Sequence, residues 1–96
     1  MEPIQGTEAS REIVLVNQKG LHVRAAMVVV DRAQKFQSEI EISKDGKTAS
    51  AKSILGLMTL KVFMGDRVRI SARGADAAEA VQSLADFAGE KFGEDI

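Results

Sequence analysis

The sequence predicts an α+β fold, an open-faced β-sandwich in which a four-stranded antiparallel sheet carries three helices on one face. Several short segments alternate apolar and polar residues, which is typical of strands with one buried face. Two longer segments repeat apolar residues at helical spacing. The predicted elements follow the order β-α-β-β-α-β-α, and four one-sided strands need their helices packed on a single face.

The first third of the chain predicts one strand and one helix. Residues 1–10 are expected to form a flexible N-terminal leader, followed by a single domain over residues 11–96. The β-branched run at residues 11–17 predicts the first strand. Apolar residues then recur at helical spacing from Val23, and the helix is expected to end near Phe36.

The middle of the chain predicts a hairpin. Residues 38–43 alternate, with isoleucines on one side and glutamates on the other. The following Asp45 and Gly46 suit the positive φ angles of a tight turn. A short strand over residues 47–51 is therefore expected to pair back.

The remaining elements are a short helix, a strand and a final helix. Ser53 stands in the N-cap position of the helix predicted from the run I-L-G-L-M-T-L. Residues 67–73 alternate cleanly and predict the fourth strand. Asp76 is expected to cap the final helix, whose apolar residues again recur at helical spacing.

Composition excludes several classes of function. The formal net charge of −1 and the absence of tyrosine and tryptophan argue against a nucleic-acid-binding protein. With no cysteine and one histidine, we expect no disulfide, no metal site and no cofactor. No apolar run is long enough to span a membrane and no signal sequence is evident, so a cytoplasmic protein without membrane insertion is expected.

The only histidine, His22, is expected at or beside the N-cap of the first helix. The first N–H groups of a helix lack partners within it and its dipole is positive there, so Val23, Arg24 and Ala25 form an expected backbone anion site. The same field disfavours a protonated imidazole, and the Arg24 guanidinium can approach a bound anion. This combination indicates a histidine that carries a phosphoryl group. The alternative, which is more common for a lone histidine, is a solvated or capping residue.

Three motifs resemble the HPr family, the histidine-containing phosphocarrier proteins of the bacterial phosphoenolpyruvate-dependent phosphotransferase system. The motifs are G-L-H-V-R-A-A, A-K-S-I-L-G-L-M-T-L and G-D-R-V-R-I, and the resemblance extends from Arg11 to about Phe92. It implies that His22 accepts a phosphoryl group on Nδ1 from phosphorylated enzyme I and passes it to a IIA component. Arg24 matches the arginine that is expected to steady the phosphoryl charge.

Other positions match the family less directly. Asn17 and Lys52 match family positions that flank two of the motifs. The common family pattern is H-x-R-P, whereas this chain has Ala25 in place of the proline. Proline has no N–H, so we expect the Ala25 N–H to be an additional donor near the phosphoryl oxygens.

The second motif implies a regulatory serine and a docking surface. Ser53 matches the serine that an HPr serine kinase/phosphorylase modifies in some bacteria. Ile54, Leu55 and Met58 match an exposed apolar patch that docks enzyme I and the IIA partners, and Met27 is assigned to the same surface. Each of these residues is more often buried, but one short helix cannot bury all its apolar side chains.

The leading interpretation is therefore a monomeric phosphocarrier, which is a substrate of phosphotransferases and not itself an enzyme. The alternative is an HPr-like regulatory protein that acts through Ser53 phosphorylation and protein contacts, with little phosphoryl relay. A third interpretation is a ferredoxin-like α+β module that binds a small ligand or a protein.

Overall fold

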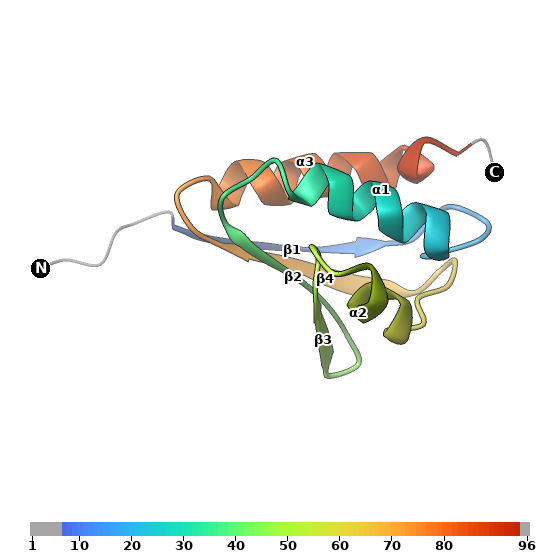
Figure 1. Ribbon diagram of the computed structural model, residues 1–96. Coiled ribbons are helices and arrows are strands. Elements are labelled where there is room, and N and C mark those ends of the chain that lie inside the picture. Colours follow the sequence, from blue (N-terminus) through green and yellow to red (C-terminus); the bar gives the residue numbers. More distant parts are fainter. Residues whose placement is uncertain (1–6, 95–96) are drawn as a thin grey trace, which may run out of the picture.

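The computed structural model describes residues 7–94, which form one twisted sheet and its covering helices (Figure 1). The sheet has the strand order β1-β4-β2-β3, and each neighbouring pair is antiparallel. This confirms the predicted open-faced α+β sandwich. The elements are β1 (Glu8–Val14), α1 (Val23–Ala33), β2 (Glu39–Lys44), β3 (Lys47–Ser50), α2 (Ile54–Thr59), β4 (Arg67–Arg73), α3 (Ala77–Gly89) and the short turn η1 (Lys91–Gly93).

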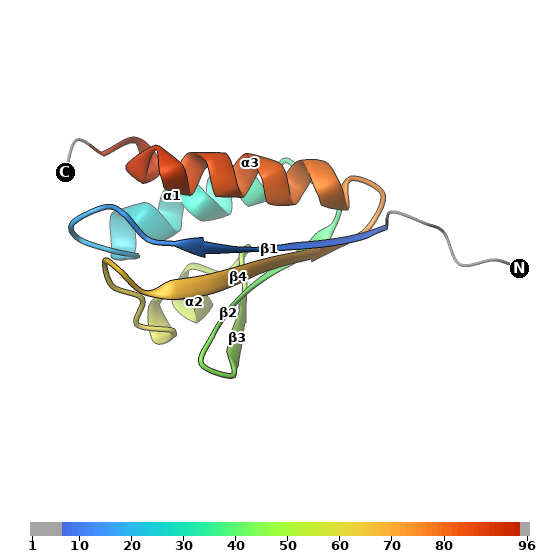
Figure 2. The same ribbon diagram turned by 180° about the vertical axis from the view of Figure 1, so that it is seen from behind.

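The core lies between the sheet and the helices. Helices α1 and α3 lie side by side along the sheet in both views, and α2 packs against α1 and β3 (Figures 1 and 2). Strand β4 shows the alternation that its sequence predicts, because Val68, Ile70 and Ala72 are buried while the three arginines of the strand, on its other face, are exposed. No helix within residues 7–94 is long and apolar enough to cross a membrane.

Strand β1 begins earlier and ends earlier than residues 11–17, the range predicted from the sequence. It pairs with β4 from Glu8, opposite Arg73, to Val14, so residues 8–10 belong to the sheet and not to a leader. The physical reason is the length of β4, whose backbone hydrogen-bonding groups stabilise a polar partner segment that has no strand pattern of its own. The predicted leader covers residues 1–10, and residues 1–6 of it lie outside the described residues.

Helix α1 ends at Ala33 and not near Phe36, as the sequence had predicted. The amides of Lys35 and Phe36 donate to carbonyls only three residues earlier, at 3.2 and 3.1 Å. Such tighter hydrogen bonds are common at the last turn of a helix. The other predicted hairpin strands and helices start or end within one residue of their observed bounds.

Asp76 precedes α3 as predicted, but its side chain does not cap that helix. Its carboxylate instead accepts hydrogen bonds from the backbone amides of Gln37 and Ser38, both at 2.9 Å, and from the Ser38 hydroxyl. The hydrogen bonds from the Ser38 hydroxyl and the Gln37 amide hold the pKa of the Asp76 carboxyl below its usual value. The residue therefore joins the start of α3 to the turn before β2.

The variant Asp76→Asn is expected to be less stable than the wild type at neutral pH, and the difference is expected to vanish in acid. A carboxyl whose pKa is lowered on folding stabilises the protein above its unfolded pKa, and this contribution is lost as the pH falls through the folded-state pKa. Urea unfolding from neutral pH into acid measures the free energy of unfolding of both proteins. The exposed Asp31→Asn is the control, and a difference between Asp76→Asn and wild type that does not change with pH would contradict the prediction.

Candidate functional site

His22 is the N-cap residue of α1, as predicted. Its backbone is extended, its carbonyl accepts the first helical hydrogen bond from Ala26 at 2.8 Å, and its side chain makes no capping bond. The amides of Val23, Arg24 and Ala25 come before this first helical hydrogen bond, so they have no acceptor within the helix. The imidazole, which is 25% exposed, therefore lies beside the end of the helix that attracts anions.

A tight turn before α1 determines where His22 lies. The Gly20 amide donates to the Asn17 carbonyl at 3.1 Å, and the Asn17 side-chain amide donates to the Gly20 carbonyl at 2.7 Å. Gly20 has a φ of +64° and lies directly against Val62 and Phe63. The next residue, Leu21, is buried and donates its amide to Val62 at 2.9 Å. These contacts hold the chain rigidly up to the residue before His22.

Glu94 is a site residue that no local pattern predicts, because it follows His22 by 72 positions. Turn η1 lies beside the start of α1 in both views and brings Glu94 to the site (Figures 1 and 2). One carboxylate oxygen contacts Nε2 of His22, and the other accepts a hydrogen bond from Asn17 Nδ2 at 3.0 Å. Burial alone raises the pKa of the Glu94 carboxyl, but the hydrogen bonds from Asn17 and His22 outweigh it and the net pKa is lowered.

The turn that delivers Glu94 has an uncommon backbone. Lys91, Phe92 and Gly93 have φ angles of 61°, 53° and 79°, all in the left-handed region. This conformation costs about 1–2 kcal/mol for a residue other than glycine. The Phe92 ring compensates by burial, since it is 8% exposed and packs edge-on against Phe87 with ring centroids 5.6 Å apart.

The other predicted site residues lie around two helix starts. Arg24 is exposed on the first turn of α1, and no hydrogen bond joins it to His22 among the described residues. Ser53 is the N-cap residue of α2, and its hydroxyl oxygen accepts from the Gly56 amide at 3.0 Å, as the sequence predicts. The Lys52 ammonium donates a hydrogen bond to the Phe36 carbonyl at 2.8 Å and so joins the segment before α2 to the turn after α1.

The residues assigned to docking differ in exposure. Leu55 is 77% exposed, Met27 53% and Ile54 39%, whereas Met58 is half-buried against the core. Leu57, two positions after Leu55 and so on the other side of α2 from it, is fully buried. Because α2 packs against α1, the exposed side chains project from two adjoining helices. We refer to Met27, Ile54, Leu55 and Met58 as the apolar patch.

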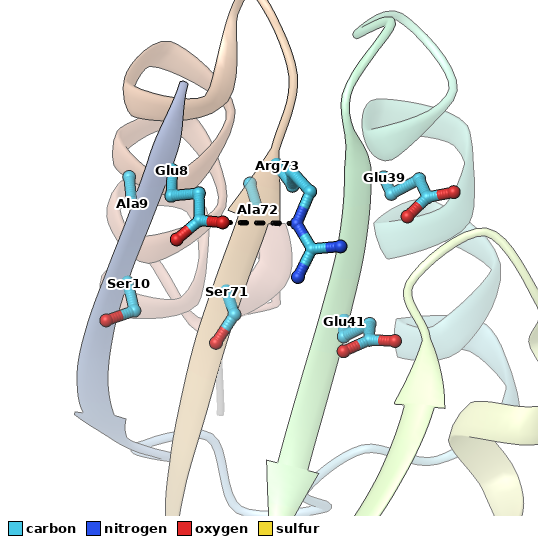
Figure 3. A pocket seen from close by; sticks show the side chains of 8 residues that line it. All are labelled: Glu8, Ala9, Ser10, Glu39, Glu41, Ser71, Ala72 and Arg73. Carbon is cyan, nitrogen blue, oxygen red and sulfur yellow. Dashed lines mark ion pairs between the residues drawn. The ribbon is translucent and has the colours of Figure 1, made fainter. Parts of the chain in front are cut away.

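A pocket of about 430 Å³ lies on the open face of the sheet, and none of the predicted site residues lines it (Figure 3). It is found where β1 begins, whereas His22 follows the other end of that strand. Most of its lining is polar, and Arg73 pairs with Glu8 at 3.3 Å within it. The polar lining residues are Glu8, Ser10, Glu39, Glu41, Ser71 and Arg73.

The chain is similar to proteins of one family over most of its length. The family described as "PTS HPr component phosphorylation site" matches residues 9–90. The phosphocarrier protein HPr of Buchnera aphidicola subsp. Baizongia pistaciae is 44% identical over 77 residues, which cover 80% of this chain and 91% of the relative.

Solved structures agree with this similarity. The crystal structure of HPr-C-His from Thermoanaerobacter tengcongensis has a TM-score of 0.88 and 43% identity, covering 92% of this chain and 99% of that one. A second structure from the same organism, described as an HPr dimer, has a TM-score of 0.72 and 41% identity, covering 98% of this chain and 100% of that one.

Proposed function

The chain belongs to the HPr family of phosphocarrier proteins, and on this basis we propose that it carries a phosphoryl group on His22 from phosphorylated enzyme I to IIA components of the phosphotransferase system. The position of His22 is the observation that carries the proposal. It is the only histidine of the chain, it is partly exposed, and it stands at the helix end that attracts anions.

In the proposed transfer, the lone pair of His22 Nδ1 attacks the phosphorus of phosphorylated enzyme I. The bond between phosphorus and the donor atom breaks, and its electron pair leaves with the donor. Negative charge is spread over the oxygens of the transferred phosphoryl group, so hydrogen-bond donors near these oxygens stabilise the transition state. We assign this role to the amides of Val23, Arg24 and Ala25 and to the Arg24 guanidinium.

The onward step is the same reaction with a IIA component as the acceptor. It restores the free imidazole, so the protein carries the group without retaining it. This chemistry needs an imidazole and no nucleotide, and we therefore describe the protein as a substrate of phosphotransferases and not as an enzyme.

The apolar patch is the proposed docking surface for enzyme I and the IIA components. Leu55, Met27 and Ile54 offer exposed aliphatic contact area on α2 and on the adjoining α1, whose N-cap residue is His22. A carrier must bind several partners and release them quickly, which suits a small apolar surface with pliable methionine. Several solved relatives are described as dimers, so the monomeric state stays a prediction. The cytoplasmic location is likewise a prediction.

Ser53 is the proposed site of regulation by an HPr serine kinase/phosphorylase. A phosphoryl group there adds a charge of about −1.5 to −2 at the start of α2, where the helix dipole favours it. The same charge lies next to Ile54 and Leu55. Docking of a partner would then have to desolvate it, so we expect inhibition without unfolding.

The variant Ser53→Asp is expected to weaken binding of enzyme I at least about tenfold, because a charge enters the apolar patch. Isothermal titration calorimetry measures the dissociation constant, and thermal unfolding checks that the fold is retained. Ser10→Asp introduces the same charge on the open face of the sheet and is the matched control. Equal affinities for the two variants would contradict the assignment of this surface.

The proposed function is tested by incubating the protein with phosphoenolpyruvate and enzyme I, followed by intact mass measurement. We expect one phosphoryl adduct that is labile in acid, as a phosphohistidine is. The absence of an adduct, with an enzyme I that phosphorylates another carrier, would overturn the proposal. Together with a Ser53→Asp effect on partner binding, that outcome would favour the regulatory alternative.

A further inference from the structure

The C-terminal turn η1 places one carboxylate on the imidazole of His22. Glu94 is only 12% exposed, and both of its oxygens are engaged, one by His22 Nε2 and one by Asn17 Nδ2. Asn17 is fully buried and also binds the Gly20 carbonyl, so it is held from two sides. The carboxylate is thus held by side chains from two other parts of the chain.

The turn itself is built to make this contact. Lys91 and Phe92 adopt left-handed backbone conformations that favour glycine, and the buried Phe92 ring anchors them on Phe87. Unfavourable backbone conformations persist only where the surrounding structure holds them, and they cluster at functional sites. Here the consequence of the conformation is that α3 is followed by a segment that directs Glu94 onto His22.

The contact determines which nitrogen of His22 is free. An ionised carboxylate can only accept hydrogen bonds, so the ring nitrogen that faces Glu94 must carry the proton. In a histidine, the hydrogen bond at one nitrogen sets the state of the other. In the neutral ring, Nε2 is therefore the protonated nitrogen and Nδ1 carries the lone pair.

We propose that Glu94 is a positioning residue for phosphoryl acceptance, which holds the His22 ring with Nε2 protonated and Nδ1 free to attack. This inference rests on the proposed function. Nδ1 forms the bond to phosphorus while the donor atom leaves with its electron pair, and Nε2 keeps its proton throughout. The phosphorylated ring is then positively charged, and the Glu94 carboxylate, already in contact with Nε2, faces that charge without rearrangement.

The first measurement needs no phosphoryl donor. In ¹⁵N-labelled wild-type protein, the His22 ring is expected to give a slowly exchanging Nε2–H proton signal and ¹⁵N shifts of the Nε2–H tautomer. Glu94→Ala is expected to lose the slowly exchanging signal, whereas Glu94→Gln, which retains an acceptor oxygen, is expected to keep part of it. Identical spectra for the wild type and Glu94→Ala would overturn the positioning role, whatever the protein does with phosphoryl donors.

The second measurement is the rate of phosphoryl acceptance from enzyme I. Glu94→Ala is expected to lower kcat about tenfold or more with little change in KM, because partner docking is untouched, and Glu94→Gln to fall between it and the wild type. Glu90→Ala removes an exposed carboxylate from the same end of the chain and is the matched control, expected to behave as wild type.

The outcomes separate the two proposals. A wild type that accepts no phosphoryl group overturns the proposed function, and the ring spectra then still decide whether Glu94 positions His22. A wild type that accepts the group while Glu94→Ala accepts it equally fast overturns the role of Glu94 alone. Thermal unfolding of each variant shows that the comparison is made between folded proteins.

Discussion

Replacing His22 with alanine is expected to abolish the acid-labile adduct and to lower phosphoryl acceptance at least about a thousandfold. The reason is chemical, because the chain has one histidine and no cysteine that could replace it as the nucleophile. Intact mass measurement after incubation with phosphoenolpyruvate and enzyme I gives the result directly. Arg24 and the backbone amides of α1 remain in the variant, but they only bind phosphoryl oxygens and supply no nucleophile, so no acid-labile adduct is expected.

The same variant is expected to remain folded, with a free energy of unfolding within about 1 kcal/mol of the wild type. The His22 side chain is partly exposed and does not cap α1, so its removal leaves the helix start intact. A persistent acid-labile adduct in His22→Ala would contradict the assignment. An acid-stable adduct would instead indicate a hydroxyl group, and Ser53 would be the first candidate.

Gly20→Ala is expected to lower the free energy of unfolding by about 3 kcal/mol or more. Gly20 has a φ of +64°, and an added Cβ would lie 2.6 Å from the carbonyl oxygen of Val62 and 2.8 Å from Cα of Phe63. Both neighbours are backbone atoms, which cannot move aside as a flexible side chain can. For a domain of this size the loss corresponds to a fall of about 12 °C or more in Tm.

Gly46→Ala separates the cost of the left-handed backbone from the cost of the steric clash that an added Cβ makes at Gly20. Gly46 also has a positive φ, +84°, but an added Cβ would have no neighbour within 4 Å. We therefore expect only the cost of the left-handed backbone, about 1–2 kcal/mol. Thermal unfolding of both variants measures the difference, and equal losses would show that the close approach of Gly20 to Val62 is unimportant.

Gly20→Ala is also expected to slow phosphoryl acceptance at a temperature where the variant is folded. The Gly20 carbonyl accepts from Asn17 Nδ2, which also binds Glu94. A backbone shift at Gly20 therefore displaces the group that holds the carboxylate on His22. Gly46, in the turn between β2 and β3, has no such connection and is expected to leave the rate unchanged.

Elements with a strong local pattern could be predicted from the sequence alone. Strand β4 has its predicted bounds because its alternation encodes which face is buried. Asp45 and Gly46 both have the positive φ angles expected of their turn. The N-cap positions of His22 and Ser53 also follow from neighbouring residues, because a helix start depends on the first turn only. The histidine, its helix end and the family resemblance were therefore accessible without coordinates.

Other features depend on residues that are far apart in the chain. Residues 8–10 join the sheet because β4 offers them partners, and Asp76 binds Ser38 because the sheet brings the two turns together. Glu94 meets His22 because α3 packs beside α1 and η1 lies against α1. Periodicity and capping reflect interactions within a few residues, so they carry no information about a contact across 72 positions. Long-range packing therefore decides which carboxylate faces the imidazole.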